Sequence, residues 1–99
     1  LWKSDGTQSG TIMIKDINPQ VGHDSEPDKF TVVGSTLFFE ANDGVYGDEL
    51  WVTDGTVNGT LMIRDFCEGS CSTNFSPFWF IGDTIYFTTD SGIFWKYLI

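Results

Sequence analysis

An internal repeat with a spacing of 49 residues limits the folds that this chain can adopt. The opening segment LWKSDGTQSGTIMIK returns 49 positions later as LWVTDGTVNGTLMIR, which begins at Leu50. The shift superposes Trp2 on Trp51 and Asp5-Gly6-Thr7 on Asp54-Gly55-Thr56. Self-similarity at a fixed period of this size is typical of repeat architectures, and the period suits a four-stranded β unit.

Nine short runs either alternate with the strand period of two or are rich in β-branched and aromatic residues. They cover residues 1–3, 11–17, 30–33, 36–41, 49–52, 60–66, 78–81, 84–89 and 94–96. Gly34-Ser35 and Gly82-Asp83 each separate two of these runs, and glycine in the first central position predicts a type II′ hairpin. No segment keeps helical apolar spacing over three turns. We therefore predict an all-β fold.

The strands group into tandem four-stranded antiparallel units that resemble propeller blades. A partial unit covers residues 1–17, a full unit 30–66 and a second partial unit 75–97, which makes about two and a quarter units. A ring of blades needs at least about four of them, and unpaired strand edges are templates for association. Because the chain also begins inside a motif, we expect either an excised part of a longer propeller or solenoid, or copies that complete one another between chains.

The charge of the chain narrows the class of its partners. Fourteen Asp and Glu stand against five Lys and Arg, a formal net charge of −9. Such a surface repels nucleic acid and anionic lipid, because phosphate binding needs clustered cations. No apolar run approaches the ~20 residues of a membrane helix, so we expect no membrane insertion. Attraction for calcium or for a basic partner stays open.

Cys67 and Cys71 are separated by three residues in CEGSC. Zinc would need further thiol or imidazole ligands, and His23 is the only histidine. Thioredoxin-type redox chemistry uses a two-residue spacer. A local disulfide is the favoured interpretation and would indicate an oxidising, extracellular compartment; two free thiols are the alternative.

Oxygen-rich turns offer candidate calcium ligands, because hard cations prefer oxygen. Asp5 and Asp54 in the Asp-Gly-Thr turns are one possibility, although Asp in a turn commonly bonds its own backbone two residues on and Gly supplies positive φ. The densest acidic cluster is formed by Asn42, Asp43, Asp48 and Glu49. It lacks the ligand spacing of a known calcium loop.

Four tryptophans divide into two groups. Trp2, Trp51 and Trp95 share one repeat position, which predicts packing between strands or units. Trp79 lies outside that series, in FSPFWF. If exposed, it can stack on a sugar ring or contact a neighbouring protein; the alternative is a crowded core strand.

Two glycosylation sequons, at Asn58 and Asn74, fall in predicted turn or loop segments. Enzyme chemistry has little support. His23 lies in a loop broken by prolines, where a solvated side chain is the simplest interpretation, and no serine or cysteine stands in a nucleophile motif.

ELWVTDGTVNGT, preceded by TLFFEANDG, resembles the bacterial ELWxxDGT repeat proteins. The resemblance extends over nearly the whole chain, although the last copy, IFWKYLI, lacks the Asp-Gly-Thr turn. It implies tandem β-propeller-like units in a secreted or surface-attached protein, and it carries over no catalytic motif.

We therefore expect a non-catalytic extracellular or cell-surface structural module, the building block of a filament or tandem array. Its partners would be copies of itself or adjacent repeats, and it would need no cofactor apart from a possible calcium ion. The alternative is an excised part of a larger β-propeller that binds polysaccharide or calcium.

Overall fold

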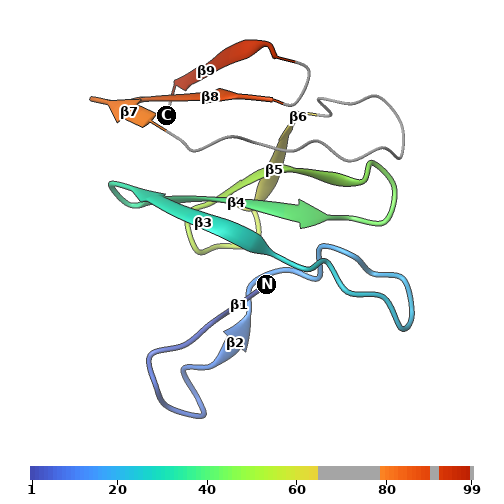
Figure 1. Cartoon of the computed structure of the whole chain (residues 1–99). Helices are drawn as coiled ribbons and strands as arrows, with labels where there is room; N and C mark the ends of the chain where they lie inside the picture. The colour runs from blue at the N-terminus through green and yellow to red at the C-terminus, as the bar shows by residue number, and fades with distance from the viewer. Residues whose placement is uncertain (65–78, 90–91, 99) are drawn as a thin grey trace.

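The computed structural model describes residues 1–64, 79–89 and 92–98, which form three antiparallel β-sheets. The first sheet pairs β1 (Trp2–Lys3) with β2 (Ile12–Met13). The second holds β3 (Asp28–Val33), β4 (Thr36–Asn42), β5 (Asp48–Thr53) and β6 (Leu61–Arg64) in that order, and the third holds β7 (Trp79–Ile81), β8 (Thr84–Thr88) and β9 (Phe94–Leu98). Figure 1 shows the sheets stacked as three layers. The described residues contain strands and no helix, so the predicted all-β class is confirmed.

Within these ranges, no helix offers the length and apolar character that a membrane crossing requires. Each of the three sheets is open, with two edge strands.

Strand bounds differ from prediction where local geometry interrupts the pairing. The run predicted at 11–17 pairs as a strand only at Ile12–Met13. Beyond it the Ile14 N–H still donates to the Leu1 carbonyl at 2.9 Å, and Ile17 then turns into the core. Residues 28–29, predicted as loop, belong to β3 instead.

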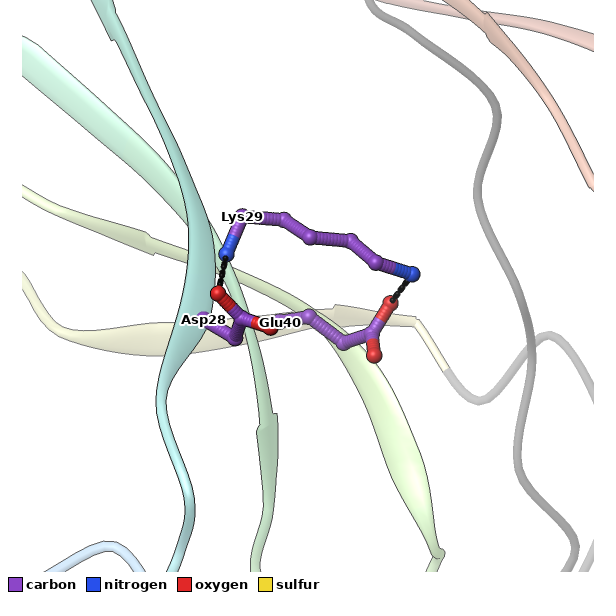
Figure 2. A network of polar contacts seen from close by, with 3 residues as sticks. All are labelled: Asp28, Lys29 and Glu40. Carbon is purple, nitrogen blue, oxygen red and sulfur yellow. Dashed lines mark hydrogen bonds and ion pairs between the residues drawn. The ribbon is translucent and has the colours of Figure 1, made fainter.

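A β-bulge explains the early start of β3. The register between β3 and β4 shifts between Asp28 and Thr31, and Lys29 has a positive φ of 55°. Asp28 Oδ1 accepts from the Lys29 N–H at 2.7 Å, while Lys29 Nζ contacts Glu40 Oε2 at 2.9 Å across the sheet (Figure 2). A bulge of this kind disrupts the free edge of β3, which limits uncontrolled pairing with other strands.

Equivalent strands pair in the same register. The pair Trp2–Met13 corresponds to the pair Trp51–Met62. The pair Thr31–Phe38 corresponds to Trp79–Tyr86. The pair Phe39–Trp51 corresponds to Phe87–Trp95. The two hairpin turns also agree, because Gly34 and Gly82 both have φ of 61°. Ser35 is not in the left-handed region, so the first of these turns has the positive φ at its first central residue alone that defines type II′.

Alternation along the strands gives each sheet two faces. We call the face that carries Trp51 or its equivalent the Trp51-type face, and the face that carries Leu50 or its equivalent the Leu50-type face. In the middle sheet, the Trp51-type face presents Phe39, Ala41, Trp51 and Met62, and the Leu50-type face presents Val33, Phe38, Leu50 and Val52.

The layers stack with unlike faces together. One core cluster joins Val33, Phe38 and Leu50 to Ile85 and Phe87, with Trp95 and Tyr97 packed against it. The second joins Ile17, Phe39, Ala41 and Trp51, with Leu1 and Met62 against it. The Leu50-type face of the middle sheet therefore covers the Trp51-type face of the third sheet. In the same way, Leu1, equivalent to Leu50, brings the first sheet onto the Trp51-type face of the middle sheet.

Candidate functional site

The two Asp-Gly-Thr turns have the same hydrogen-bonded geometry. In the first, Asp5 Oδ1 accepts from the Thr7 N–H at 2.9 Å and from the Thr7 hydroxyl at 2.6 Å. In the second, Asp54 Oδ1 accepts from the Thr56 N–H at 2.9 Å and from the Thr56 hydroxyl at 2.7 Å. These are turns in which aspartate bonds its own backbone two residues on.

Hydrogen bonds to the glycine and threonine that end the motif, Gly59 and Thr60 in the second turn, complete each turn. The Thr56 hydroxyl accepts from the Gly59 N–H at 3.0 Å, and the Thr60 hydroxyl donates to the Thr56 carbonyl at 2.6 Å. Thr60 also shares a buried hydrogen bond of 2.7 Å with Thr53. Each of these contacts has a counterpart in the first turn.

Both glycine positions of the motif have a physical reason. Gly6 and Gly55 adopt φ of 92° and 93°, a region that glycine enters without strain. A Cβ on Gly59 would lie 2.0 Å from Asp54 Oδ1, and one on Gly10 would lie 1.9 Å from Asp5 Oδ1. The motif residues thus specify a turn whose exposed carboxylate is hydrogen-bonded within its own loop.

The same contacts perturb the two carboxylates. Hydrogen bonds from the side chain and then the backbone of Thr7 lower the pKa of Asp5. Those from Thr56 lower the pKa of Asp54, to which the charge of Lys3 adds. Donors inside the turn thus favour the ionised form of both carboxylates and lower both pKa values.

A cation from one layer lies over the tryptophan of the next layer. Lys15 Nζ is 5.9 Å from the ring centre of Trp51, and the guanidinium carbon of Arg64 is 4.8 Å from that of Trp95. Lys15 and Arg64 are 49 positions apart, like the rest of the repeat. Cation–π contacts of this kind add a polar component to the apolar stacking of the layers.

Lys3 makes a second polar contact between layers. Its Nζ donates to the Gly55 carbonyl at 2.9 Å, which places a cation of the first sheet on the Asp-Gly-Thr turn of the following unit. The contact borders an apolar hollow of about 390 Å³ whose lining includes Leu1, Trp2, Phe30 and Leu37.

The three repeated tryptophans are not equally packed. Trp51 is 6% exposed and Trp95 packs against the core, as predicted. Trp2 lies opposite Met13 in the first sheet but is 63% exposed, so the packing between strands or units predicted for it is at most partial within the described residues. The physical reason is that no sheet in the described ranges lies over the Trp51-type face of β1 and β2.

The exposure of Trp79 distinguishes between the two interpretations of this residue, a contact residue on the surface or a residue of a core strand. Trp79 is 55% exposed and shares a row with Tyr86 and Lys96 on the Leu50-type face of the third sheet. Its position is therefore compatible with contact to a partner and not with a crowded core.

The predicted calcium cluster does not converge. Among the described residues, no three His, Cys, Asp or Glu side chains form a group that would hold a metal ion. Asn42 accepts from the Gly44 N–H, Asp43 accepts from Val45 and Tyr46 N–H groups, and Glu49 is fully buried. Asn42 lines a polar hollow of about 380 Å³ with His23 and Asp24, whereas Asp43, Asp48 and Glu49 do not.

The remaining predicted site residues are either exposed or outside the residues that the structure describes. Asn58 is an exposed residue in the second Asp-Gly-Thr turn, and His23 is an exposed loop residue. Cys67, Cys71 and Asn74 lie outside the described residues.

Sequence reasoning missed the cations that connect the layers, at Lys3, Lys15 and Arg64. A signal was present for two of them, because Lys15 and Arg64 occupy the same position of the repeat. What their side chains contact depends on how the sheets stack.

Comparison of the chain with protein-family models, with curated proteins and with solved structures finds no match. The functional interpretation therefore rests on the geometry of the chain itself.

Proposed function

We propose that the chain is a non-catalytic structural module whose units stack face to face in a filament or tandem array at the cell surface or outside the cell. The observation that carries this proposal is the repeated contact between layers. Twice in the chain, a Leu50-type face meets a Trp51-type face, and twice a cation lies over the tryptophan of the next layer. A contact that recurs with the sequence repeat is a device for adding units one after another.

The proposal includes blade-like units of the ELWxxDGT kind. It is supported by the strand order β3-β4-β5-β6 of the complete sheet and by the matching registers of the partial sheets. The motif residues Asp54, Gly55, Thr56, Gly59 and Thr60 all have roles in building the turn. A structural role accounts for them without chemistry.

The proposed extracellular location is tested by looking for a disulfide and for glycosylation in the native protein. In the native protein, intact-mass analysis with and without reduction is expected to find Cys67 and Cys71 joined. Glycopeptide mapping would examine Asn58 and Asn74. A reduced, unmodified protein from its native compartment would contradict the assignment.

The assembly itself is tested by electron microscopy and sedimentation velocity of the purified chain over a range of concentrations. We expect elongated, concentration-dependent assemblies. Monodisperse closed rings or monomers at every concentration would contradict the proposal.

A second candidate function, glycan binding, is favoured by one observation, the exposure of Trp79. An exposed indole beside Tyr86 and Lys96 offers a flat apolar surface and a hydrogen-bond donor to a sugar ring. Glycan-array binding that disappears in Trp79→Ala but persists in the exposed-loop control Val45→Ala would support it.

A further inference from the structure

The outer surface of the third sheet is unusually apolar for an exposed face. Its Leu50-type face presents Trp79, Ile81, Tyr86, Phe94 and Leu98, with Lys96 as its cation. Four of these side chains are more than half exposed: Trp79, Ile81, Phe94 and Leu98. Contiguous exposed apolar residues with a charged neighbour mark an interaction site.

The repeat indicates what kind of surface covers this face. Tyr86 and Phe94 occupy the positions of Phe38 and Leu50, which are both 0% exposed beneath the third sheet. In the middle sheet, then, the same face is covered by a Trp51-type face. Continuity of the stack predicts a Trp51-type face over the third sheet as well.

The first sheet displays such a face. Trp2 and Met13 stand opposite each other on β1 and β2, and they are 63% and 49% exposed. Their counterparts Trp51 and Met62 are packed in the core. The chain thus carries both halves of the contact, one at each end of its three-layer stack (Figure 1).

A polar pair fits the same arrangement. Lys3 and Lys96 are equivalent positions on the Leu50-type face, and Lys3 donates to the Gly55 carbonyl of the next unit beside Asp54. In the first turn, Gly6 is equivalent to Gly55 and Asp5 is equivalent to Asp54. A second copy stacked in this way would offer Lys96 the acceptor that Gly55 offers Lys3.

We propose that the exposed face of β7–β9 binds the Trp2–Met13 face of a second copy, with Lys96 donating to the Gly6 carbonyl beside Asp5. This inference rests on the proposed function and specifies its contact. The interface joins two different surfaces, so every copy added leaves one new face free, and growth continues from copy to copy unless the rotation closes a ring.

The test uses two variants of the full chain, each blocked on one face. Phe94→Glu/Lys96→Glu blocks the outer face of the third sheet, and Trp2→Glu/Met13→Glu blocks the face of the first. Each variant alone is expected to weaken association by about 30-fold or more, the effect of losing an interface hot spot. Mixed together, they are expected to form a 1:1 dimer in sedimentation velocity, because each retains the face that the other lacks.

Two controls separate interface effects from folding and charge. Val45→Glu/Val57→Glu adds two carboxylates at exposed loop positions and is expected to assemble like the wild type. Lys96→Arg retains a donor and is expected to retain assembly, whereas Lys96→Glu alone is expected to weaken it. Circular dichroism would verify that each variant is folded.

The outcomes distinguish this contact from the proposed function. If the wild type assembles and the blocked variants assemble equally well, the contact is wrong while the structural function stands. If folded blocked variants are monomeric but do not dimerise when mixed, the two faces are not partners. A wild-type chain that stays monomeric overturns both proposals.

Discussion

A single carboxylate oxygen organises each Asp-Gly-Thr turn. Asp54 Oδ1 accepts two hydrogen bonds from Thr56, and Gly59 approaches so closely that a side chain would overlap the carboxylate. Asp5, Thr7 and Gly10 repeat the arrangement. The motif therefore specifies a backbone conformation. Each of its residue types either makes a hydrogen bond within the turn or leaves room for one.

The clash at Gly59 gives the first prediction. Gly59→Ala would force the added methyl group against Asp54 and open the turn, which we expect to cost about 1–3 kcal/mol of unfolding free energy. Urea denaturation followed by circular dichroism measures it. Val57→Ala, at an exposed position of the same turn, is the control and should stay within about 0.5 kcal/mol. An unchanged stability of Gly59→Ala would show that the turn has another conformation.

The lowered pKa values of Asp5 and Asp54 predict a pH dependence. Since the folded pKa of each lies below the ordinary value of 3.8, the unfolded chain binds more protons between the two values. Their contribution to stability is therefore present above pH 3.8 and is lost as the pH falls through the folded pKa. Urea unfolding at a series of pH values measures the slope.

The matched variant for that experiment is Thr56→Val, which removes the hydroxyl that donates to Asp54 at nearly constant volume. The pKa of Asp54 should then rise toward its ordinary value in an NMR titration, while that of Asp5 stays low. An Asp54 pKa that does not move would contradict the role of the hydroxyl.

At the scale of elements, side chains at the same strand position differ in exposure from one sheet to another. Leu50 and Phe94 begin equivalent stretches of β5 and β9, yet one is 0% and the other 62% exposed. The difference arises because β7–β9 covers the Leu50-type face of the middle sheet, whereas no described element covers that of the third.

This contrast predicts unequal costs of truncation. Leu50→Ala should lose about 2–5 kcal/mol, because it leaves a cavity between two sheets. Phe94→Ala should lose less than about 1 kcal/mol of monomer stability, since Phe94 is mostly exposed and stacks on Tyr86 at the surface. Both are measured by denaturant unfolding at a concentration too low for assembly. Equal losses would mean that the Phe94 face is covered within the monomer.

At the scale of the whole molecule, the net charge of −9 opposes the association that the faces favour. Like charges on neighbouring copies repel over roughly 30 Å at 0.01 M salt but only about 8 Å at 0.15 M. The local Lys96 contact is a small part of this total.

We therefore predict that raising the salt concentration from about 0.01 to about 0.15 M promotes assembly, because the range of repulsion shrinks. Light scattering at fixed protein concentration measures the effect, and the blocked variant Phe94→Glu/Lys96→Glu is the control that should stay unassembled. Dissociation on adding salt would indicate that charge attraction, and not apolar stacking, holds the copies together.

The strands, the hairpin turns and the Asp-Gly-Thr geometry could be predicted from the amino-acid sequence. These features follow from local rules, namely alternation, positive φ at Gly34, and the fit of Asp54 to Thr56 and Gly59. Which copy of a repeated residue is covered depends instead on how the sheets stack in three dimensions. Trp2 and Trp51 occupy the same position of the repeat, each directly after a leucine, but burial depends on whether another sheet lies above them. The sequence likewise placed Asp43, Asp48 and Glu49 in one acidic cluster. In the structure Asp48 and Glu49 are neighbours on β5, and neighbouring positions on a strand point to opposite faces, whereas Asp43 lies in the turn before β5.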